Sequence, residues 1–386
     1  MSPSLRFPEF TGEWKEERLS EIADIYKGAG ISKDQLSDNG EPCILYGELY
    51  TKYKTETITE VISRTDIDNT KLVRSKANDV IIPCSGETAE DIATARCVIK
   101  DGILLGGDSN IIRLHNYDGS FVSYQLNGKR KYDIAKVAQG VSVVHLYGEH
   151  LKGVKTVNPC LAEQKKISRF LSLLDERIAV QNRLIEDLKK LSCAIVEKMF
   201  KQSKTNGRLG DFIEQVSVRN KNGLYSNVLS VSNKQGFVKQ SEQFEDRTVA
   251  SEDTSNYKIV KRNNFAYNPA RINVGSIARL TKFDVGIVSP MYVCFRTKAS
   301  IIPEYMEAFF TSQQFFYEMM KRLEGSVRLC LSYEGLCNIP VYIPDMNKQI
   351  AMGQNISLIL SKIGLEIEYL GRLHQQKQYL LRKMFI

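Results

Sequence analysis

The sequence predicts an α+β protein built from two copies of one design. Each copy holds a domain with a mostly antiparallel sheet and a long helix, and the two helices pair as an antiparallel coiled coil. The letters IVEKMF at Ile195–Phe200 return as LLRKMF at Leu380–Phe385. Residues 140–200 align with residues 325–385 without a gap. Before each ending, apolar residues recur at alternating steps of three and four, which is typical of a coiled-coil seam.

The repeat gives the chain an internal pseudo-two-fold organisation. Pro159 and Gln164 lead into the first helix pattern as Pro344 and Gln349 lead into the second. Upstream, RLSEIADI from Arg18 resembles RLGDFIEQ further along the chain. The predicted boundaries are a globular domain at 1–160, a long helix with its linker at 161–206, a second globular domain at 207–345 and a second long helix at 346–386.

The globular stretches carry short runs typical of β-strands, bounded by Gly, Asn, Asp and Pro. Examples are DVIIPC and SNIIRL in the first stretch, and NVLSVS and GIVSPMYVCF in the second. Short helical segments interrupt them, as in the run that begins at Pro303. We therefore expect a compact α+β domain in each stretch.

The helical seam predicts which residues face the partner helix, although two amphipathic helices packed on separate domains would show a similar pattern. The predicted register places Ile178 opposite Leu380 and Gln181 opposite Lys377, so that polar seam positions meet each other. It likewise pairs Ile185 with Leu373, Leu188 with Leu370, Ile195 with Ile363 and Ser192 with Glu366. The predicted seam residues are Leu174, Ile178, Gln181, Ile185, Leu188, Ser192, Ile195, Met199, Ile359, Ile363, Glu366, Leu370, Leu373, Lys377, Leu380 and Met384.

Composition narrows the class of protein. The 386 residues, 42% hydrophobic and 25% charged, are typical of a soluble globular protein of about two domains. No apolar run reaches the roughly 18 residues that would span a bilayer, so we expect a cytoplasmic protein. The eight cysteines form no Cys-x-x-Cys pair and the four histidines no helical His-x-x-x-His, so we expect no metal site. A net charge of +8 permits nucleic-acid binding without requiring it.

Several longer stretches, in the same order in both halves, resemble one known family. They are LRFPEFTGEWKEERLSEI, NDVIIPCSGETAEDIATA, LLGGDSNIIRL, FAYNPARINVGSIARL and GIVSPMYVCFR, with VNPCLAEQKKI and YIPDMNKQI before the long helices. In this order they resemble the specificity subunits of type I restriction–modification systems. The resemblance covers nearly the whole chain.

The resemblance implies a non-catalytic subunit that recognises DNA. Each globular domain would be a target recognition domain that reads one half of a split, asymmetric site in double-stranded DNA. The helices would act as a spacer and as a docking surface for two methyltransferase subunits, with two restriction or motor subunits in the full complex. S-adenosylmethionine, ATP and magnesium would act only in those partners. Domains on one face of B-DNA would read half-sites about 10 bp apart, centre to centre.

Two clusters at the same position of the repeat are candidates for DNA contacts. Basic groups neutralise phosphates, and Arg, Gln and Asn make bidentate contacts to base edges. A solvated loop at a helix terminus would have a similar composition. The candidates are Lys129, Arg130, Lys131, Tyr132, Gln139, Ser142 and His145 around Gly140, and Lys321, Arg322, Ser326 and Arg328 around Gly325.

A third stretch, YNPARINVGSIAR, offers Asn268, Arg271, Asn273 and Arg279. Its Asn-Pro lacks the second proline and the aromatic residue of the Asn-Pro-Pro-Tyr/Phe motif of adenine methyltransferases. CSGET at Cys84–Thr88 lacks a Gly-x-Ser-x-Gly frame, and LLGGDSN is typical of a bend between strands. No Walker A pattern occurs, so we expect no catalytic residue in this chain.

Two other functions remain as alternatives. The chain could be a self-contained DNA methyltransferase or nuclease, which would require it to bind a cofactor by itself. It could instead be a coiled-coil scaffold whose domains bind protein. In that case DNA affinity would lack the steep salt dependence that phosphate contacts impose.

Overall fold

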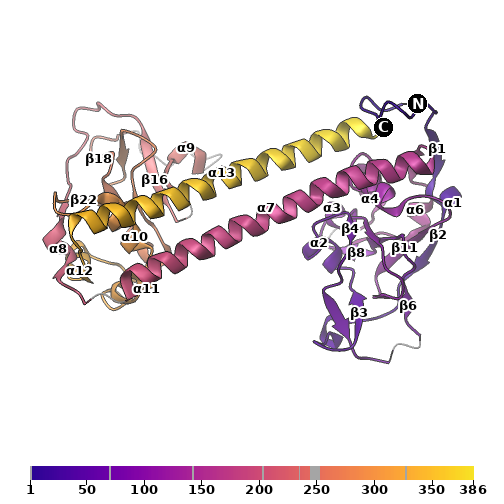
Figure 1. The fold of residues 1–386 in the computed structure, drawn as a ribbon, viewed down its shortest axis with the longest axis horizontal. Coiled ribbons are helices and arrows are strands. Elements are labelled where there is room, and N and C mark those ends of the chain that lie inside the picture. Colours follow the sequence, from indigo (N-terminus) through magenta and orange to yellow (C-terminus); the bar gives the residue numbers. More distant parts are fainter. Residues whose placement is uncertain are drawn as a thin grey trace. The chain divides into compact units, whose positions relative to one another are not determined.

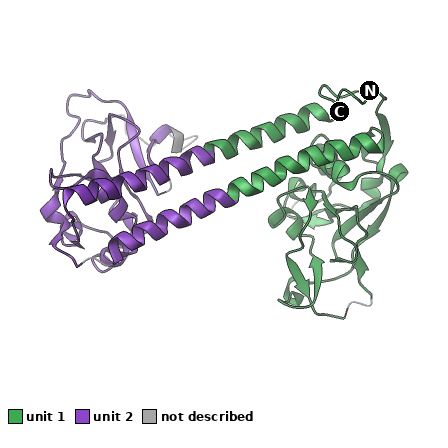
Figure 2. Cartoon of the chain, in the orientation of Figure 1, with its two compact units in different colours: residues 1–182, 368–386 green, residues 183–367 purple. Residues whose placement is uncertain are grey.

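The computed structural model describes residues 2–68, 71–140, 143–201, 204–233, 235–243, 253–326 and 328–386. The chain divides into two compact units (Figure 2). Unit 1 comprises residues 1–182 and 368–386, and unit 2 comprises residues 183–367. Figure 1 labels the two long helices, α7 (Leu161–Lys201) and α13 (Met346–Met384). Each begins in one unit and ends in the other, as the change of colour along each helix shows (Figure 2).

Unit 1 contains two main sheets in which antiparallel pairs predominate. The larger has the strand order β2-β11-β7-β9-β4 and the smaller β5-β3-β10-β6, with parallel pairs only at β3/β10 and β4/β9 among the described residues. The strands are β1 (Lys15–Arg18), β2 (Ala23–Lys27), β3 (Glu41–Ile44), β4 (Thr57–Ile58), β5 (Ser63–Thr65), β6 (Val73–Arg74), β7 (Asp79–Pro83), β8 (Ser85–Gly86), β9 (Arg96–Val98), β10 (Leu104–Leu105), β11 (Ser109–Leu114), β12 (Val144–His145) and β13 (Lys155–Asn158).

Short helices cover the larger sheet of unit 1 and close its core. They are α1 (Leu19–Ile22), α2 (Glu48–Thr51), α3 (Ala89–Ile92), α4 (Gly119–Asn127), α5 (Lys131–Val137) and α6 (Gly148–Lys152), with a 3-10 turn at Lys33–Gln35. The runs DVIIPC and SNIIRL form β7 and β11, as predicted. These strands are buried along most of their length because helices pack on the sheet.

Unit 2 contains two four-stranded sheets, ordered β15-β22-β19-β20 and β17-β16-β21-β18. Its strands are β14 (Gly207–Arg208), β15 (Ile213–Gln215), β16 (Val228–Ser232), β17 (Gly236–Lys239), β18 (Lys258–Lys261), β19 (Phe265–Tyr267), β20 (Ile277–Arg279), β21 (Val285–Val288), β22 (Val293–Thr297) and β23 (Pro340–Val341). Its short helices are α8 (Leu209–Phe212), α9 (Gln240–Gln243), α10 (Pro303–Phe310), α11 (Gln313–Met320) and α12 (Tyr333–Cys337), with a 3-10 turn at Ile272–Val274.

The Pro…Gln lead-in has the same physical role in both units. In unit 1, Gln164 Nε2 donates to the Pro159 carbonyl at 2.9 Å, and Gln164 Oε1 accepts from the backbone N–H of Asp118, the N-cap of α4. In unit 2, Gln349 Nε2 donates to the Pro344 carbonyl at 3.0 Å, and its Oε1 accepts from the N-cap of α10. Both glutamines are 1% exposed. The motif therefore fastens the start of each long helix to its own globular domain.

Within unit 1, the two long helices run antiparallel and pack together, as predicted. Lys377 Nζ lies 2.6 Å from Asp175 Oδ1, while the Arg177 guanidinium lies 5.4 Å from the ring centroid of Tyr369. Arg177 follows Asp175 along α7, whereas its partner Tyr369 precedes Lys377 along α13, so the two helices run in opposite directions. All sixteen predicted seam positions are buried or half-buried, whereas Val180 and Leu358 outside the seam are 65% and 69% exposed.

The predicted register is wrong in unit 1 by about one heptad. It placed Lys377 opposite Gln181, yet Lys377 is bound to Asp175. Asp175 lies about 9 Å closer to the N-terminus of α7 than Gln181, at ~1.5 Å per residue. Side chains lean toward the N-terminus of their own helix, so in the predicted register the side chains of Lys377 and Asp175 would point away from each other. Ile167 and Leu171, and not Ile178, share the core cluster of Leu380. The seam repeats every seven residues, so apolar spacing alone admits either register.

Candidate nucleic-acid interface

Unit 1 presents a narrow loop between the end of α5 and β12. The backbone groups of Gln139 and His145 bond to each other in both directions, at 2.9 and 2.7 Å. Gly140 follows Gln139 with φ 121°, and a Cβ there would overlap the carbonyl oxygen of Val143. The side chains of Gln139, Val143 and His145 are exposed. The predicted contact Ser142 lies outside the described residues.

Unit 2 presents the same loop after α11. The backbone groups of Glu324 and Cys330 bond in both directions, at 2.9 and 2.8 Å. Gly325 has φ 115°, and a Cβ there would overlap the carbonyl oxygen of Arg328. Ser326 and Arg328 are exposed. Since left-handed backbone is a glycine conformation, the glycine pair found in the repeat reflects a shared loop geometry.

The basic run of unit 1 lies at the start of α5. Lys129 is exposed, and Tyr132 is 68% exposed. Arg130 is the N-cap residue of α5, and its guanidinium lies 3.4 Å from Asp133 Oδ2. Lys131 is half-buried. The run therefore presents cations at the N-terminal end of α5, whose C-terminal end leads into the loop around Gly140, with Arg130 partly occupied by the helix that it caps.

The basic residues of unit 2 are held by one carboxylate on α11. Glu318 accepts from Lys321 at 2.8 Å and from Arg322 at 2.7 Å. The hydrogen bond from Lys321 leads the lowering of the pKa of Glu318, against the opposing effect of burial. Lys321 remains about half exposed while Arg322 is 25% exposed. Ionised Glu318 thus orders both cations at the base of the loop.

The third predicted group is divided by the structure. Asn268 is 8% exposed, and its Oδ1 accepts from the backbone N–H of Ala270 in a turn. Arg279 is 9% exposed and forms ion pairs with Glu304 and Glu307 on α10. Arg271 is exposed and Asn273 is half-buried. The first two side chains are engaged within unit 2, which leaves Arg271 and Asn273 accessible.

The sequence prediction missed two residues next to these clusters, Lys136 and Tyr317. Lys136 Nζ lies 4.4 Å from the ring centroid of Tyr132, and Lys321 Nζ lies 3.8 Å from that of Tyr317. The ungapped alignment that pairs Gly140 with Gly325 also pairs these residues, when it is extended a few positions upstream. That extension is the signal that could have found them.

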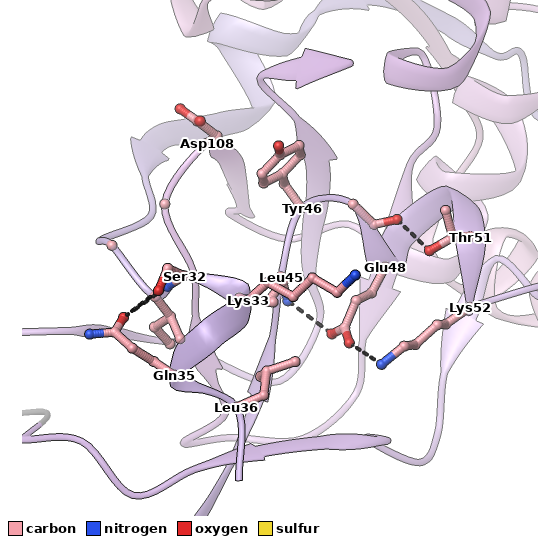
Figure 3. Close-up of a pocket in the computed structure, with 14 residues that line it drawn as sticks. Ser32, Lys33, Gln35, Leu36, Leu45, Tyr46, Glu48, Thr51, Lys52 and Asp108 are labelled. Atoms are coloured by element: carbon pink, nitrogen blue, oxygen red, sulfur yellow. Dashed lines mark hydrogen bonds and ion pairs between the residues drawn. The ribbon is translucent and has the colours of Figure 1, made fainter. Parts of the chain in front are cut away.

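A cavity of about 1000 Å³ opens in unit 1 between the 3-10 turn at Lys33–Gln35 and α2 (Figure 3). Buried Glu48 accepts from Lys52 at 2.6 Å and from the backbone N–H of Leu45 at 3.0 Å. Ser32 pairs with Gln35 at the other wall. The buried carboxylate of Glu48 is satisfied from within the protein, so this wall holds no uncompensated charge for a ligand.

The described ranges contain no group of three or more His, Cys, Asp or Glu side chains arranged to hold a metal ion. All eight cysteines are free thiols. Burial raises the pKa of the Cys43 and Cys84 thiols to about 11. These thiols would be protonated near neutral pH, which disfavours a nucleophilic role. Among the described helices, none is both long and apolar enough to cross a membrane.

Comparison with known proteins agrees with this architecture. Residues 11–190 match the family described as the Type I restriction modification DNA specificity domain. The chain is 26% identical over 200 residues to the Type I restriction enzyme MjaVIII specificity subunit of Methanocaldococcus jannaschii. That match covers 51% of this chain and 43% of the relative, so it spans less than half of the relative's length.

Two solved structures share the fold over nearly the whole chain. The type I restriction–modification S subunit from M. genitalium superposes with a TM-score of 0.66 at 18% identity, covering 100% of this chain and 99% of the other. A chain from a study of the assembly and conformational transition of the type I R-M system gives a TM-score of 0.55 at 13% identity, covering 97% and 98%. Sequence matches and shared fold together lead to one conclusion: residues 11–190 form a type I restriction modification DNA specificity domain, and the whole chain has the fold of a type I restriction–modification S subunit.

Proposed function

We propose that this chain reads a split, asymmetric DNA target, one half through each unit, and positions methyltransferase subunits on that target. The observation that carries the proposal is the matched loop around Gly140 and Gly325, which follows a helix bearing exposed basic and aromatic residues in both units. Cations beside such a loop neutralise phosphates, and polar loop side chains reach base edges. Because the loop sequences differ, the two half-sites should differ.

Two methyltransferase subunits and two restriction or motor subunits complete the proposed complex. S-adenosylmethionine, ATP and magnesium belong to those partners, and this chain supplies recognition and placement. The exposed outer faces of α7 and α13 are the surface on which we place methyltransferase docking, since apolar Val180 and Leu358 are exposed there.

The proposal is tested by methylation mapping. The chain and the proposed methyltransferase partner are expressed, together and singly, in a host without DNA methylation, and methyladenine is mapped across the genome. We expect a split asymmetric motif only when both proteins are present. Methylation by this chain alone would make it an enzyme. No methylation from a purified, assembled complex would favour a protein-binding scaffold.

Alanine in place of each loop glycine should weaken recognition of one half-site. Gly140→Ala places a Cβ on a left-handed backbone, where it overlaps the carbonyl oxygen of Val143. Gly325→Ala likewise places a Cβ on a left-handed backbone, against the carbonyl oxygen of Arg328. A strain of about 1–3 kcal/mol should lower the affinity for the cognate duplex by about fivefold to about 150-fold. Methylation maps of the two variants should relax opposite halves of the motif.

Two other glycines supply matched controls for backbone strain. Gly102 in unit 1 has φ 79° and Gly223 in unit 2 has φ 60°, and nothing lies within 4 Å of a Cβ built at either. Alanine there imposes strain without touching the loops. Equal loss of recognition in the control and loop variants would show that general destabilisation, and not loop geometry, accounts for the effect.

A further inference from the structure

The Tyr–Lys pairs on α5 and α11 are the same feature in both units. Tyr132 and Lys136 occupy α5, and Tyr317 and Lys321 lie on α11 and at its C-cap. In each unit the lysine precedes the loop glycine by the same number of residues. The residues around the pairs differ: Lys131 and Ala135 in unit 1 correspond to Phe316 and Met320 in unit 2.

Each pair is held outward by a buried neighbour on the opposite face of its helix. Ile134 is 0% exposed and Met319 is 1% exposed, and each lies two residues after the tyrosine. The tyrosines remain 68% and 63% exposed. A large aromatic ring gains little folding energy at such exposure, so packing does not account for its presence in both copies.

The two lysines share a contact with a tyrosine ring but differ in their other contacts. Lys321 also pairs with Glu318, whereas Lys136 has no carboxylate partner among the described residues. The common arrangement is an ammonium group over a tyrosine ring, at 4.4 and 3.8 Å. A lysine ordered in this way presents its remaining N–H donors to solvent at a lower entropic cost than a free side chain.

We propose that Tyr132–Lys136 and Tyr317–Lys321 are matched anchors for the phosphodiester backbone of double-stranded DNA, one beside each reading loop. This inference rests on the proposed function, and it assigns the sequence-independent part of DNA binding to these two pairs. Lysine is a point charge that binds phosphate without distinguishing bases, and an aromatic ring packs on sugars and on any base. The anchors set affinity and place the loops around Gly140 and Gly325, whose side chains select the sequence.

The test measures how affinity depends on salt. Full-length chain assembled with its methyltransferase is titrated with a fluorescent duplex carrying the mapped motif and with an unrelated duplex of equal length, from about 50 to about 200 mM salt. For Lys136→Gln with Lys321→Gln, both affinities should fall by a similar factor. The salt slope should fall by about 0.9 per lysine, hence by about two, and the methylated motif should be unchanged.

Two further variants keep the result interpretable. Lys136→Arg with Lys321→Arg retains charge and ring contact and should restore most of the slope. Lys155→Gln removes a lysine that is 52% exposed on β13 and paired with Glu16 on β1, outside the loops and the long helices, and it should leave the slope unchanged. An unchanged slope in the double glutamine variant, with a wild-type thermal unfolding midpoint, would overturn the anchors. A loss confined to the cognate duplex would do so as well.

Failure of the anchors can be told from failure of the proposed function. If the wild-type complex binds neither duplex with a salt-dependent affinity, DNA reading itself is wrong. If the wild type binds both but the double variant matches it, only the assignment of these two pairs is wrong.

Discussion

Phe385→Ala should destabilise unit 1 by about 3–5 kcal/mol and leave unit 2 nearly unchanged. Phe385 is 2% exposed, and its ring centroid lies 5.2 Å from that of Phe121 on α4. Trp14 packs against the same Phe121 ring at 5.8 Å. Truncation would leave a cavity among side chains that come from the two ends of the chain. Hydrogen exchange resolved by peptide should show faster exchange throughout unit 1.

The repeat offers the reciprocal variant. Phe200 is 2% exposed at the end of α7, with Tyr305 and Phe309 of α10 at 5.4 and 5.3 Å. Phe200→Ala should accelerate exchange in unit 2 and spare unit 1. Tyr379→Ala, at a residue that is 52% exposed on α13, serves as a surface control. Equal effects of both phenylalanine variants on both units would contradict the separate cores.

Lys377→Met should cost unit 1 about 3–5 kcal/mol, because it leaves two buried carboxylates without their cation. The Lys377 side chain is 13% exposed, and its Nζ lies 2.7 Å from Glu56 and 2.6 Å from Asp175. Burial opposes its charge, but the two carboxylates outweigh burial and raise the pKa of Lys377. Tyr124 also donates to Asp175, at 2.6 Å. Urea unfolding at neutral pH measures the loss.

The loss of folding stability in Lys377→Met should depend on pH. In the wild type, burial and the neighbouring Glu56 already raise the pKa of Asp175, and the ammonium group of Lys377 opposes them. Removing that ammonium group should raise the pKa further above the unfolded value of about 3.9. The folded variant then binds more protons than the unfolded chain, so its stability falls as pH rises above that value. The gap between wild type and variant should therefore be smaller near pH 4 than near pH 8. In the wild type, the raised pKa keeps the contribution of Lys377 up to alkaline pH, where it is lost.

Removing the carboxylates together with the cation is the control. Lys377→Met combined with Glu56→Gln and Asp175→Asn should recover much of the stability, because no unpaired buried charge remains. A triple variant as unstable as the single one would show that the methylene chain of Lys377, and not its charge, supports the core.

The sequence predicted the repeat, the paired helices and the place of the loops, because each left a local signal. Heptad spacing revealed the seam of α7 and α13, but spacing alone cannot choose between registers that differ by seven residues. In the observed register Lys377 contacts both Asp175 and Glu56, and Glu56 lies far from either helix in the sequence. The engagement of Arg279 was equally hidden, because Glu304 and Glu307 belong to another element. The helix register and the ion pairs of Arg279 both involve residues that are distant in the sequence.

The recurring KMF endings have a consequence for synthesis on the ribosome. Unit 2 is a continuous stretch of chain, whereas unit 1 combines residues 1–182 with residues 368–386, which are synthesised after unit 2. Val196 and Phe200 can join the core of unit 2 as soon as that unit emerges, but Leu380, Met384 and Phe385 reach the core of unit 1 only after all of unit 2 has been synthesised. Domains usually fold in the order in which they are made. Here the unit that is translated first is the last to complete its core, so a truncated product lacks a finished first unit.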